Sequence, residues 1–340
     1  MSASLLTPAD GPAVVIRLGA LGDVALATGV LEYWRLTKGL HVVFMTRDRF
    51  APLFLGHPAV TRTIQVTQAQ SQGAAWVRTA RSLAGEFPGH LLIDLHGSVR
   101  SRTLSLLWNG PVARYPTHAL QRRVYLRWRS IAARRALLAA DVPRRYAMAL
   151  EPEPPSAPLR PRVFLTTAEV AAAHALLEQR SIGGRIAALH PYATHPLKTW
   201  PRPAWNELVR SLAAAGWDWV ALGRDPNPFL GAIDAARDLT NRTDLRTTCS
   251  LLACASVLIT ADSGPMHLAE AVGTPLIALF GPTAREWGFY PGGSRDVVME
   301  LPMECRPCSL HGTKRIECPR ECLEGITPAA VVAQLQRYER

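Results

Sequence analysis

The chain has 340 residues, of which 48% are hydrophobic, and its formal net charge is +11. This length suffices for two domains of ordinary size, each with its own core. No stretch approaches the roughly 18–20 continuous apolar residues of a membrane span, and the first residues lack the features of a cleavable signal, so we expect a cytoplasmic protein with reduced thiols.

The charge excess lies in the first half of the chain. Residues 1–160 contain 20 Lys and Arg against nine Asp and Glu, whereas residues 161–340 contain 18 of each. The densest part lies between Arg114 and Arg135, with aromatic residues interleaved and no acid before Asp141. An acidic small substrate, an anionic membrane surface and nucleic acid are the candidate partners, and a solvated basic helix is the alternative. Because no nucleic-acid motif is present, that partner ranks last.

Strands and helices are predicted to alternate in the first half. A glycine-containing turn at residues 19–23 connects the first strand to the first helix. The predicted strands are 13–18, 41–45, 63–66 and 91–95, and the predicted helices are 24–36 and 74–85. Such alternation indicates α/β architecture with a parallel, doubly wound sheet.

A Pro-rich segment at residues 151–158 is typical of a linker, and the alternation resumes after it. The predicted helices of the second half are 167–179, 203–215 and 328–338, and the first two predicted strands are 185–190 and 218–223. The chain is therefore expected to form two Rossmann-like domains.

Residues 257–283 are the most informative stretch of the second half. Apolar runs at 257–260 and 276–280 predict two buried strands, and the segment from Pro265 to Ala271 predicts the helix between them. Asp262 or Ser263 would cap this helix, and its N-terminus would provide a seat for a phosphate group. An ordinary capped helix with a solvent-facing His267 is the alternative.

Polar or glycine-rich turns follow five of the predicted strands. Open α/β sheets bind ligands at the carboxyl ends of their strands, so these turns are expected to carry the chemistry. They are residues 19–23, 95–100, 190–198, 223–225 and 261–267.

Four of these segments resemble glycosyltransferase family 9, the ADP-heptose:lipopolysaccharide heptosyltransferases. They are RLGALGD at 17–23, DLHGSVRS at 94–101, KTWP at 198–201, and DSGPMHLAEA at 262–271 with the following PLIALFGPT strand. The resemblance extends over nearly the whole chain. It implies a GT-B fold, with two doubly wound Rossmann-like domains facing a central cleft. The implied divisions are an acceptor domain at 1–155, a nucleotide-sugar domain at 156–325 with a four-Cys segment at 305–322, and a last helix at 326–340 that crosses back to the first domain.

The resemblance also implies the roles of individual residues. Asp23 matches the general base of an inverting displacement, and Lys198 matches the lysine that offsets charge on the leaving diphosphate. The alternatives are that Asp23 only caps its helix and that Lys198 lies on the surface. The implied donor-binding residues are Thr194, Thr199, Asp225, Asp262, Ser263, Gly264 and His267. The expected acceptor-binding residues are Gly22, His96, Arg100, Arg102, Arg122 and Arg123, where the arginines suit an acidic sugar. Trp200 and Trp205 are expected to pack in the core.

Six cysteines are present, and four of them form a separate pattern. Cys249 and Cys254 lie in a helical, apolar stretch typical of core thiols. The other four have the spacing of a tetrathiolate site for structural zinc, or for iron or an iron–sulfur cluster, with unligated thiols or disulfides as alternatives. They are Cys305, Cys308, Cys318 and Cys322. The resemblance implies that catalysis itself needs no cofactor.

The leading hypothesis is an inverting heptosyltransferase that uses ADP-heptose and an anionic glycan or glycolipid of the lipopolysaccharide inner core. The basic first half suggests peripheral contact with the anionic inner-membrane surface. A family member that modifies a protein Ser or Thr, or another surface glycan, is the second hypothesis, because a four-Cys finger occurs in a branch acting on autotransporter proteins. A non-catalytic nucleotide-sugar-binding protein is the third.

Overall fold

Two five-stranded parallel sheets organise the chain into two compact units. The computed structural model describes residues 11–310 and 320–338. The first unit comprises the described residues up to Thr117 together with Val142–Pro161, and the second comprises His118–Asp141 and the described residues from Arg162 onwards. The predicted α/β architecture with parallel, doubly wound sheets is confirmed.

The sheet of the first unit has the strand order β3-β2-β1-β4-β5, and every neighbouring pair is parallel. Its central strand β1 is buried at all four positions, because helices cover both faces of such a sheet. Trp76, Ala80 and Leu83 of α2 and Leu104 of α3 pack on the sheet in one hydrophobic cluster. The elements are β1 (Ala13–Ile16), α1 (Leu21–Lys38), β2 (Val42–Arg47), η1 (Asp48–Phe54), β3 (Val60–Val66), α2 (Gly73–Glu86), β4 (Leu92–Asp94), α3 (Val99–Leu107), β5 (Val112–Arg114) and α6 (Val142–Ala147).

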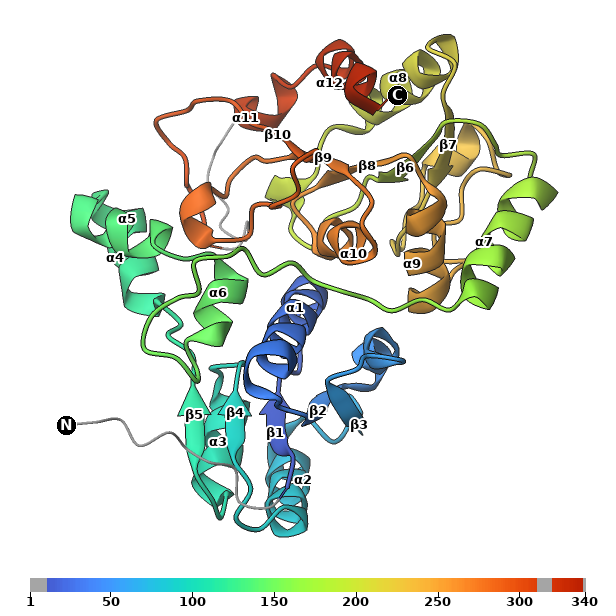
Figure 1. Ribbon diagram of the computed structural model, residues 1–340. Helices are drawn as coiled ribbons and strands as arrows, with labels where there is room; N and C mark the ends of the chain where they lie inside the picture. The colour runs from blue at the N-terminus through green and yellow to red at the C-terminus, as the bar shows by residue number, and fades with distance from the viewer. Residues whose placement is uncertain (1–10, 311–319, 339–340) are drawn as a thin grey trace. The chain divides into compact units, whose positions relative to one another are not determined.

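The sheet of the second unit has the order β10-β9-β8-β6-β7 and is also parallel throughout. Helices α8 and α12 cover one face of this sheet, and α9 and α10 cover the other (Figure 1). The strands are β6 (Ile186–His190), β7 (Asp218–Ala221), β8 (Val257–Ala261), β9 (Leu276–Leu279) and β10 (Val297–Met299). The helices are α4 (Ala119–Trp128), α5 (Ile131–Leu138), α7 (Thr167–Gln179), η2 (Pro196–Lys198), α8 (Arg202–Ala214), η3 (Leu230–Ala232), α9 (Leu245–Cys254), α10 (Gly264–Val272), η4 (Arg285–Trp287), α11 (Glu321–Glu324), α12 (Pro328–Leu335) and η5 (Gln336–Tyr338).

Two segments belong to a different unit from the one expected. Helices α4 and α5 fall within residues 1–155, yet Tyr125 and Leu137 pack with Trp287 of the second unit. The last helix, expected to cross back to the first domain, packs on α8, and its Val331 and Leu335 lie in the core of the second unit. Apolar contacts with local partners therefore decide the placement of both segments.

The Pro-rich segment has no helix or strand, and the boundary between the units follows it, at residues 161 and 162.

Trp200 and Trp205 are fully buried, which confirms that they pack in the core. Within residues 11–310 and 320–338, no helix combines the length and the apolar composition that crossing a bilayer requires.

Candidate functional site

The carboxyl ends of β1 and β4 mark the topological switch point of the first sheet. The chain continues from β1 towards β2 and β3 on one side, and returns to β4 on the other. Loops diverge at such a point and leave room for a ligand. The turn after β1 leads to Asp23, and the turn after β4 leads to His96.

Asp23 is held by two side chains at this switch point. Its Oδ2 lies 2.5 Å from a guanidinium nitrogen of Arg17, and its Oδ1 accepts a hydrogen bond from the Tyr146 hydroxyl at 3.1 Å. Burial raises the pKa of Tyr146, which therefore stays a phenol that can donate. The N-cap of α1 is Ala20, so Asp23 does not cap its helix. A carboxylate has about four lone-pair positions, so Asp23 retains capacity for a further proton or hydroxyl.

His96 lies beside this carboxylate and is uncharged at neutral pH. Asp94 fixes the turn, because its Oδ1 accepts hydrogen bonds from the N–H groups of His96 and Gly97 at 2.8 and 2.9 Å. Both ring nitrogens of His96 are buried and have no hydrogen-bond partner among the described residues. Burial and then the charge of Arg17 lower the pKa of His96 to about 3. A neutral imidazole with two unused nitrogens is suited to bind a hydroxyl.

Basic side chains surround the same edge of the first sheet. Arg100 donates from Nε to the Ser71 carbonyl at 2.7 Å, and Arg47 hydrogen-bonds to the Ser71 hydroxyl. Burial and then the charges of Arg49 and Arg100 lower the pKa of Arg47, which indicates concentrated positive charge. The sequence interpretation missed Arg47 and Arg49, although Arg47 ends a strand whose carboxyl end reaches this edge.

The other expected acceptor residues are divided between the units. Gly22 lies in the first turn of α1, and Arg102 is exposed on α3. Arg122 and Arg123 belong to α4 and therefore to the second unit. The guanidinium of Arg122 lies 5.9 Å from the ring centroid of Phe289, so part of its surface is used for packing.

The second sheet has its switch point between β6 and β8. Lys198, at the end of η2 after β6, forms an ion pair of 2.6 Å with Oδ2 of Asp262, which follows β8. The Thr283 hydroxyl donates to the same oxygen at 2.6 Å. Asp262 is only 9% exposed, so Lys198 is fixed in the site rather than free on the surface. The position of Thr283 was not anticipated, because it follows a third strand, β9.

The N-terminus of α10 lies at this switch point. Ser263 is its N-cap residue and Pro265 stands in its first turn, as expected. Among the described residues, however, the Ser263 side chain caps no N–H of the helix, and its hydroxyl lies 3.1 Å from Nδ1 of His190. First-turn N–H groups, including that of Gly264, carry the partial positive charge of a helix N-terminus. This end of α10 is suited to bind an anion.

His267 faces the interior of the unit and is only 3% exposed, so the solvent-facing alternative is wrong. Its Nδ1 lies 2.7 Å from Oε2 of Glu270, whose other oxygen accepts from the Gly292 N–H at 2.9 Å. Glu270 thus fixes the ring orientation and leaves Nε2 for another partner.

Arg306 holds the loop that carries Thr283. It donates from Nε to the Gly281 carbonyl at 2.6 Å and from Nη2 to the Thr283 carbonyl at 2.9 Å. An ion pair of 2.6 Å with Glu300 fixes the guanidinium from the other side. Because the Thr283 hydroxyl contacts Asp262, Arg306 supports the lysine–aspartate pair indirectly. Sequence reasoning missed this residue, since nothing in its spacing relates it to the loop.

The remaining expected donor residues have less defined surroundings. Thr194 is exposed, and Thr199 is the C-cap of η2. Asp225 follows β7 and closes a loop, since its Oδ1 accepts from the Asn227 N–H at 2.8 Å. These residues lie on loops at the carboxyl edge of the second sheet.

The cysteines differ in their surroundings. Burial raises the pKa of Cys249 to about 12, which confirms a core thiol. Cys305 is exposed, whereas Cys322 lies in the hydrophobic core of the second unit. The N–H of Cys308 donates to the Pro282 carbonyl at 3.0 Å. Cys318 lies outside the described residues, and within those residues no three His, Cys, Asp or Glu side chains form a metal-binding group. The four-Cys metal site remains a prediction.

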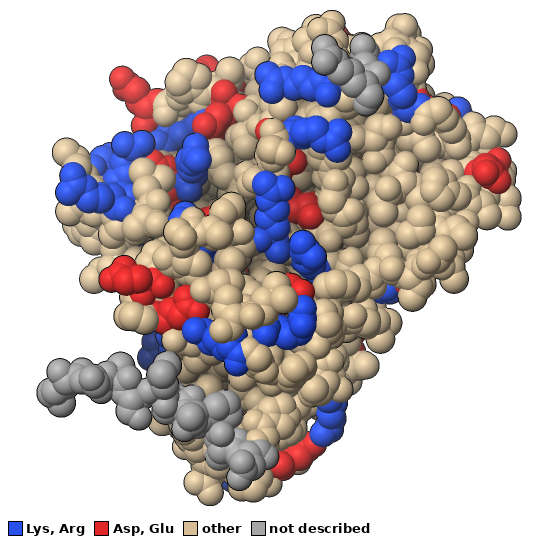
Figure 2. Space-filling model, in the orientation of Figure 1, with Lys and Arg blue, Asp and Glu red and all other residues tan. Residues whose placement is uncertain are grey.

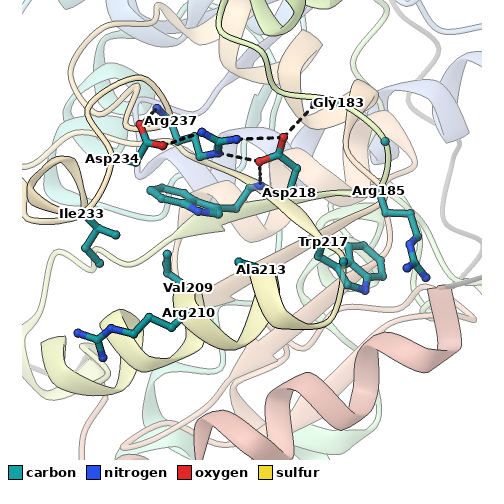
Figure 3. Close-up of a pocket in the computed structure, with 13 residues that line it drawn as sticks. Gly183, Arg185, Val209, Arg210, Ala213, Trp217, Asp218, Ile233, Asp234 and Arg237 are labelled. Carbon is teal, nitrogen blue, oxygen red and sulfur yellow. Dashed lines mark hydrogen bonds and ion pairs between the residues drawn. The ribbon is translucent and has the colours of Figure 1, made fainter.

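A separate pocket of about 550 Å³ opens at the amino ends of β6 and β7 (Figure 3). Arg237 lies between two carboxylates there, with Nε 2.7 Å from Asp218 and Nη1 2.6 Å from Asp234. The positive charge of Arg237 is therefore compensated by these two carboxylates. This pocket lies at the opposite end of the sheet from Lys198, so the two are distinct.

Comparison with protein families gives one match over most of the chain. The model of glycosyltransferase family 9 (heptosyltransferase) matches residues 78–318. Lipopolysaccharide heptosyltransferase 1 of Pseudomonas aeruginosa is 26% identical over 95% of this chain and 96% of its own length. Lipopolysaccharide heptosyltransferase 2 of Salmonella typhimurium is 32% identical over 102 residues, which span 27% of this chain and only 29% of that enzyme.

Solved structures share the fold at lower sequence identity. A family 9 glycosyl transferase from Veillonella parvula has a TM-score of 0.76 at 17% identity, with 96% of each chain covered. Escherichia coli heptosyltransferase WaaC with ADP-2-deoxy-2-fluoro heptose has a TM-score of 0.62 at 20% identity, covering 96% of this chain and 99% of that one. The iron-containing dodecameric glycosyltransferase TibC from enterotoxigenic E. coli has a TM-score of 0.61 at 16% identity, covering 97% and 76%. The predicted GT-B fold of two Rossmann-like units is confirmed.

Proposed function

The chain belongs to glycosyltransferase family 9, and we propose that it is an inverting heptosyltransferase. It would move a heptose from ADP-heptose to an acceptor in the lipopolysaccharide inner core. The observation that carries the proposal is the pair of switch-point sites. One presents a positioned carboxylate, Asp23, and the other presents Lys198 beside a helix N-terminus.

The donor is assigned to the second unit. Lys198 and the first turn of α10, with Ser263 and Gly264, would bind the diphosphate, and His267 would donate or accept through Nε2. Asp262 orients Lys198 rather than contacting the donor, because Lys198 and Thr283 share its Oδ2. Thr194, Thr199 and Asp225 would bind more peripheral parts of the nucleotide sugar. Fixed positive charge at the diphosphate stabilises the charge that develops as ADP leaves.

The acceptor is assigned to the carboxyl edge of the first sheet. Its hydroxyl oxygen attacks the anomeric carbon from the face opposite the diphosphate, the bond between that carbon and the diphosphate oxygen breaks, and Asp23 takes the hydroxyl proton. Arg17 and Tyr146 hold Asp23 for this task. Turnover requires that this hydroxyl meets the donor bound by the second unit.

An anionic acceptor is favoured by the arginines of the first site. Arg100 and Arg102, together with Arg47, provide charge for a Kdo-bearing or phosphorylated core sugar. The neutral His96 and the backbone at Gly22 would contact uncharged parts of the acceptor. Arg122 and Arg123, which were also expected to bind the acceptor, lie on α4 in the second unit, and their role stays a prediction. A glycolipid acceptor places the enzyme in the cytoplasm at the anionic face of the inner membrane.

The cysteine segment favours a second candidate acceptor, a protein Ser or Thr. The C-x-x-C and C-x-x-x-C spacing suits structural zinc or iron held by Cys305, Cys308, Cys318 and Cys322. Such a metal would stabilise the segment around Arg306, and no catalytic step uses it. Elemental analysis of the purified protein tests the metal: one zinc or iron per chain supports it, and none rejects it.

A transfer assay tests the proposed function. The purified chain is incubated with ADP-heptose and either a Kdo-bearing lipid acceptor or serine-containing autotransporter peptides, and products are identified by mass spectrometry. We expect heptose on the glycolipid, and no product with Asp23→Ala. Peptide modification alone would select the second candidate. Donor binding without transfer to any acceptor would indicate a non-catalytic protein.

A further inference from the structure

The helical hairpin formed by α4 and α5 is anchored to the second unit by one side. Tyr125 and Leu137 pack with Trp287 in a small hydrophobic cluster. The Tyr125 hydroxyl donates to Oε1 of Glu286 at 3.1 Å, and Arg134 forms an ion pair of 2.7 Å with the same oxygen. The hairpin is therefore fixed to the second unit by apolar packing and by a carboxylate that two of its side chains share.

The other side of the hairpin exposes large apolar side chains. Trp128 and Ile131 flank the two-residue connection between the helices and are 68% and 81% exposed. Leu120, in the first turn of α4, is 69% exposed. Exposed residues of this size are common singly, but a tip that combines Trp128 with Ile131 is a concentrated apolar surface.

Arginines surround these apolar residues, and one of them, Arg134, is paired with an acid outside the hairpin, Glu286. Residues 115–140 contain no Asp or Glu. Figure 2 shows blue side chains gathered over α4 and α5 at the left of the view. By their spacing, Leu120, Arg123 and Arg127 share one face of α4. The exposed arginines are Arg123, Arg127, Arg129, Arg134 and Arg135.

We propose that the tip and exposed face of the α4–α5 hairpin dock onto an anionic phospholipid bilayer, with Trp128 and Ile131 entering the headgroup region. Basic helices with Trp and aliphatic residues on the surface bind at this depth, where arginine side chains reach the phosphates and the indole lies at the interface. Nucleic acid fits less well, because an exposed Ile and Leu neither stack on bases nor hydrogen-bond to them. A second copy of this chain would have to match the concentrated positive charge with acids.

This inference deepens the proposed function, because an enzyme with a glycolipid acceptor meets it at a membrane. The docking surface belongs to the unit that carries Lys198 and the proposed donor site. Docking would therefore keep the donor unit at the bilayer.

Vesicle sedimentation with the full chain tests the proposal. Vesicles of phosphatidylethanolamine and phosphatidylglycerol are compared with vesicles of phosphatidylcholine alone. We expect binding only to the anionic vesicles, and weaker binding at high salt. Reversing Arg127 and Arg135 to Glu should weaken partitioning at least about tenfold. The matched control reverses Arg78 and Arg81, which are exposed on α2, and should bind like the wild type.

The apolar contribution is tested separately. Trp128→Ser combined with Ile131→Ser should weaken binding about tenfold or more, whereas Leu36→Ser with Leu106→Ser, also exposed, should not. If both variants at the hairpin bind like the wild type, the proposal fails. If only the charge reversal matters, insertion is wrong and a surface for nucleic acid or another polyanion replaces it. Self-association that both hairpin variants abolish, without vesicle binding, would replace the bilayer by a second copy.

The outcome is separable from that of the proposed function. Transfer to a water-soluble, delipidated acceptor should be unchanged in the hairpin variants, which retain Asp23 and Lys198. Vesicle binding without any transfer would leave the docking surface in place and reject the enzymatic proposal. Transfer without vesicle binding would support the enzymatic proposal and reject the docking surface.

Discussion

The switch points of the two sheets have equivalent topology but opposite chemistry. In the first unit the central group is a carboxylate, Asp23, held by Arg17 and Tyr146. In the second it is an ammonium, Lys198, held by Asp262 next to a helix N-terminus. Both central charges are fixed by an oppositely charged partner, so each is positioned before any ligand arrives.

The difference indicates how one architecture supports two tasks. Parallel sheets bring loops together at their carboxyl ends, and the side chains on those loops then decide the chemistry. A carboxylate with spare lone pairs suits proton acceptance, and an ammonium with free N–H groups suits a diphosphate.

Within the second unit, the largest expected effect comes from Lys198. Lys198→Ala should lower kcat/KM for transfer by about 100-fold or more, because the developing charge on the diphosphate loses its nearest cation. Lys198→Arg should retain part of the activity, since it keeps the charge. Steady-state kinetics with ADP-heptose measure both variants. Near-wild-type activity of the alanine variant would remove Lys198 from the donor site.

The next effect concerns the stability of the second unit. Burial lowers the pKa of His190 to about 4, while an unfolded histidine titrates near about 6.5. The unfolded chain therefore binds a proton first as the pH falls, and the stability is complete above about pH 6.5 and lost towards pH 4. Protonation of His190 in the unfolded chain should therefore lower the free energy of unfolding by about 2 kcal/mol when the pH falls from 7 to 5.

Urea unfolding at the two pH values measures this loss. His190→Asn should show a smaller decrease than the wild type, whereas His174→Asn, at an exposed position, should match the wild type. An equal decrease in all three proteins would mean that His190 does not control the pH dependence.

A smaller effect is expected at Arg306, which supports the donor site through the Gly281–Thr283 loop. Arg306→Ala should raise the KM for ADP-heptose by about tenfold and change kcat less, because looser positioning of Asp262 and Lys198 weakens donor binding. Arg306→Lys should restore part of the loss. Arg320→Ala, which removes a half-buried arginine paired with Glu324, is the control. A loss of thermal stability with unchanged KM would show a purely structural role.

The smallest effect is expected at His96, and it tests the role of this residue in the site of the first unit. His96→Gln should raise the KM for the acceptor by about threefold to tenfold and leave the KM for the donor unchanged, because one hydrogen bond to a hydroxyl is weakened. Since the pKa of His96 is about 3, the pH profile of kcat/KM between about pH 5 and 8 should keep its shape. A titration near pH 6.5 that disappears in the variant would contradict a neutral His96.

The sequence predicted the fold from its alternating pattern. Helix α7, expected at 167–179, has those bounds in the structure, and the central strands differ by a few residues only. The short strand Val112–Arg114 was missed because three residues carry too little periodicity. The packing of α4 and α5 in the second unit was not predictable, since their partners, including Trp287, lie far along the chain.

The candidate sites were predictable where topology brings strand ends together. The rule that ligands bind at the carboxyl ends pointed to Lys198 and Asp262, which the structure joins in an ion pair. Contacts that depend on packing were not predictable. Tyr146 lies 123 residues from Asp23, and no local pattern relates the two. Arg306 likewise acts on backbone carbonyls, which carry no sequence signal.

Calorimetric titration of ADP-heptose into Asp23→Asn and Lys198→Ala tests the division of tasks between the two units most directly. We expect Asp23→Asn to bind the donor within about twofold of the wild-type affinity while transferring no heptose, and Lys198→Ala to lose most of the donor affinity. Loss of donor binding in Asp23→Asn, together with retained binding in Lys198→Ala, would contradict this division of tasks.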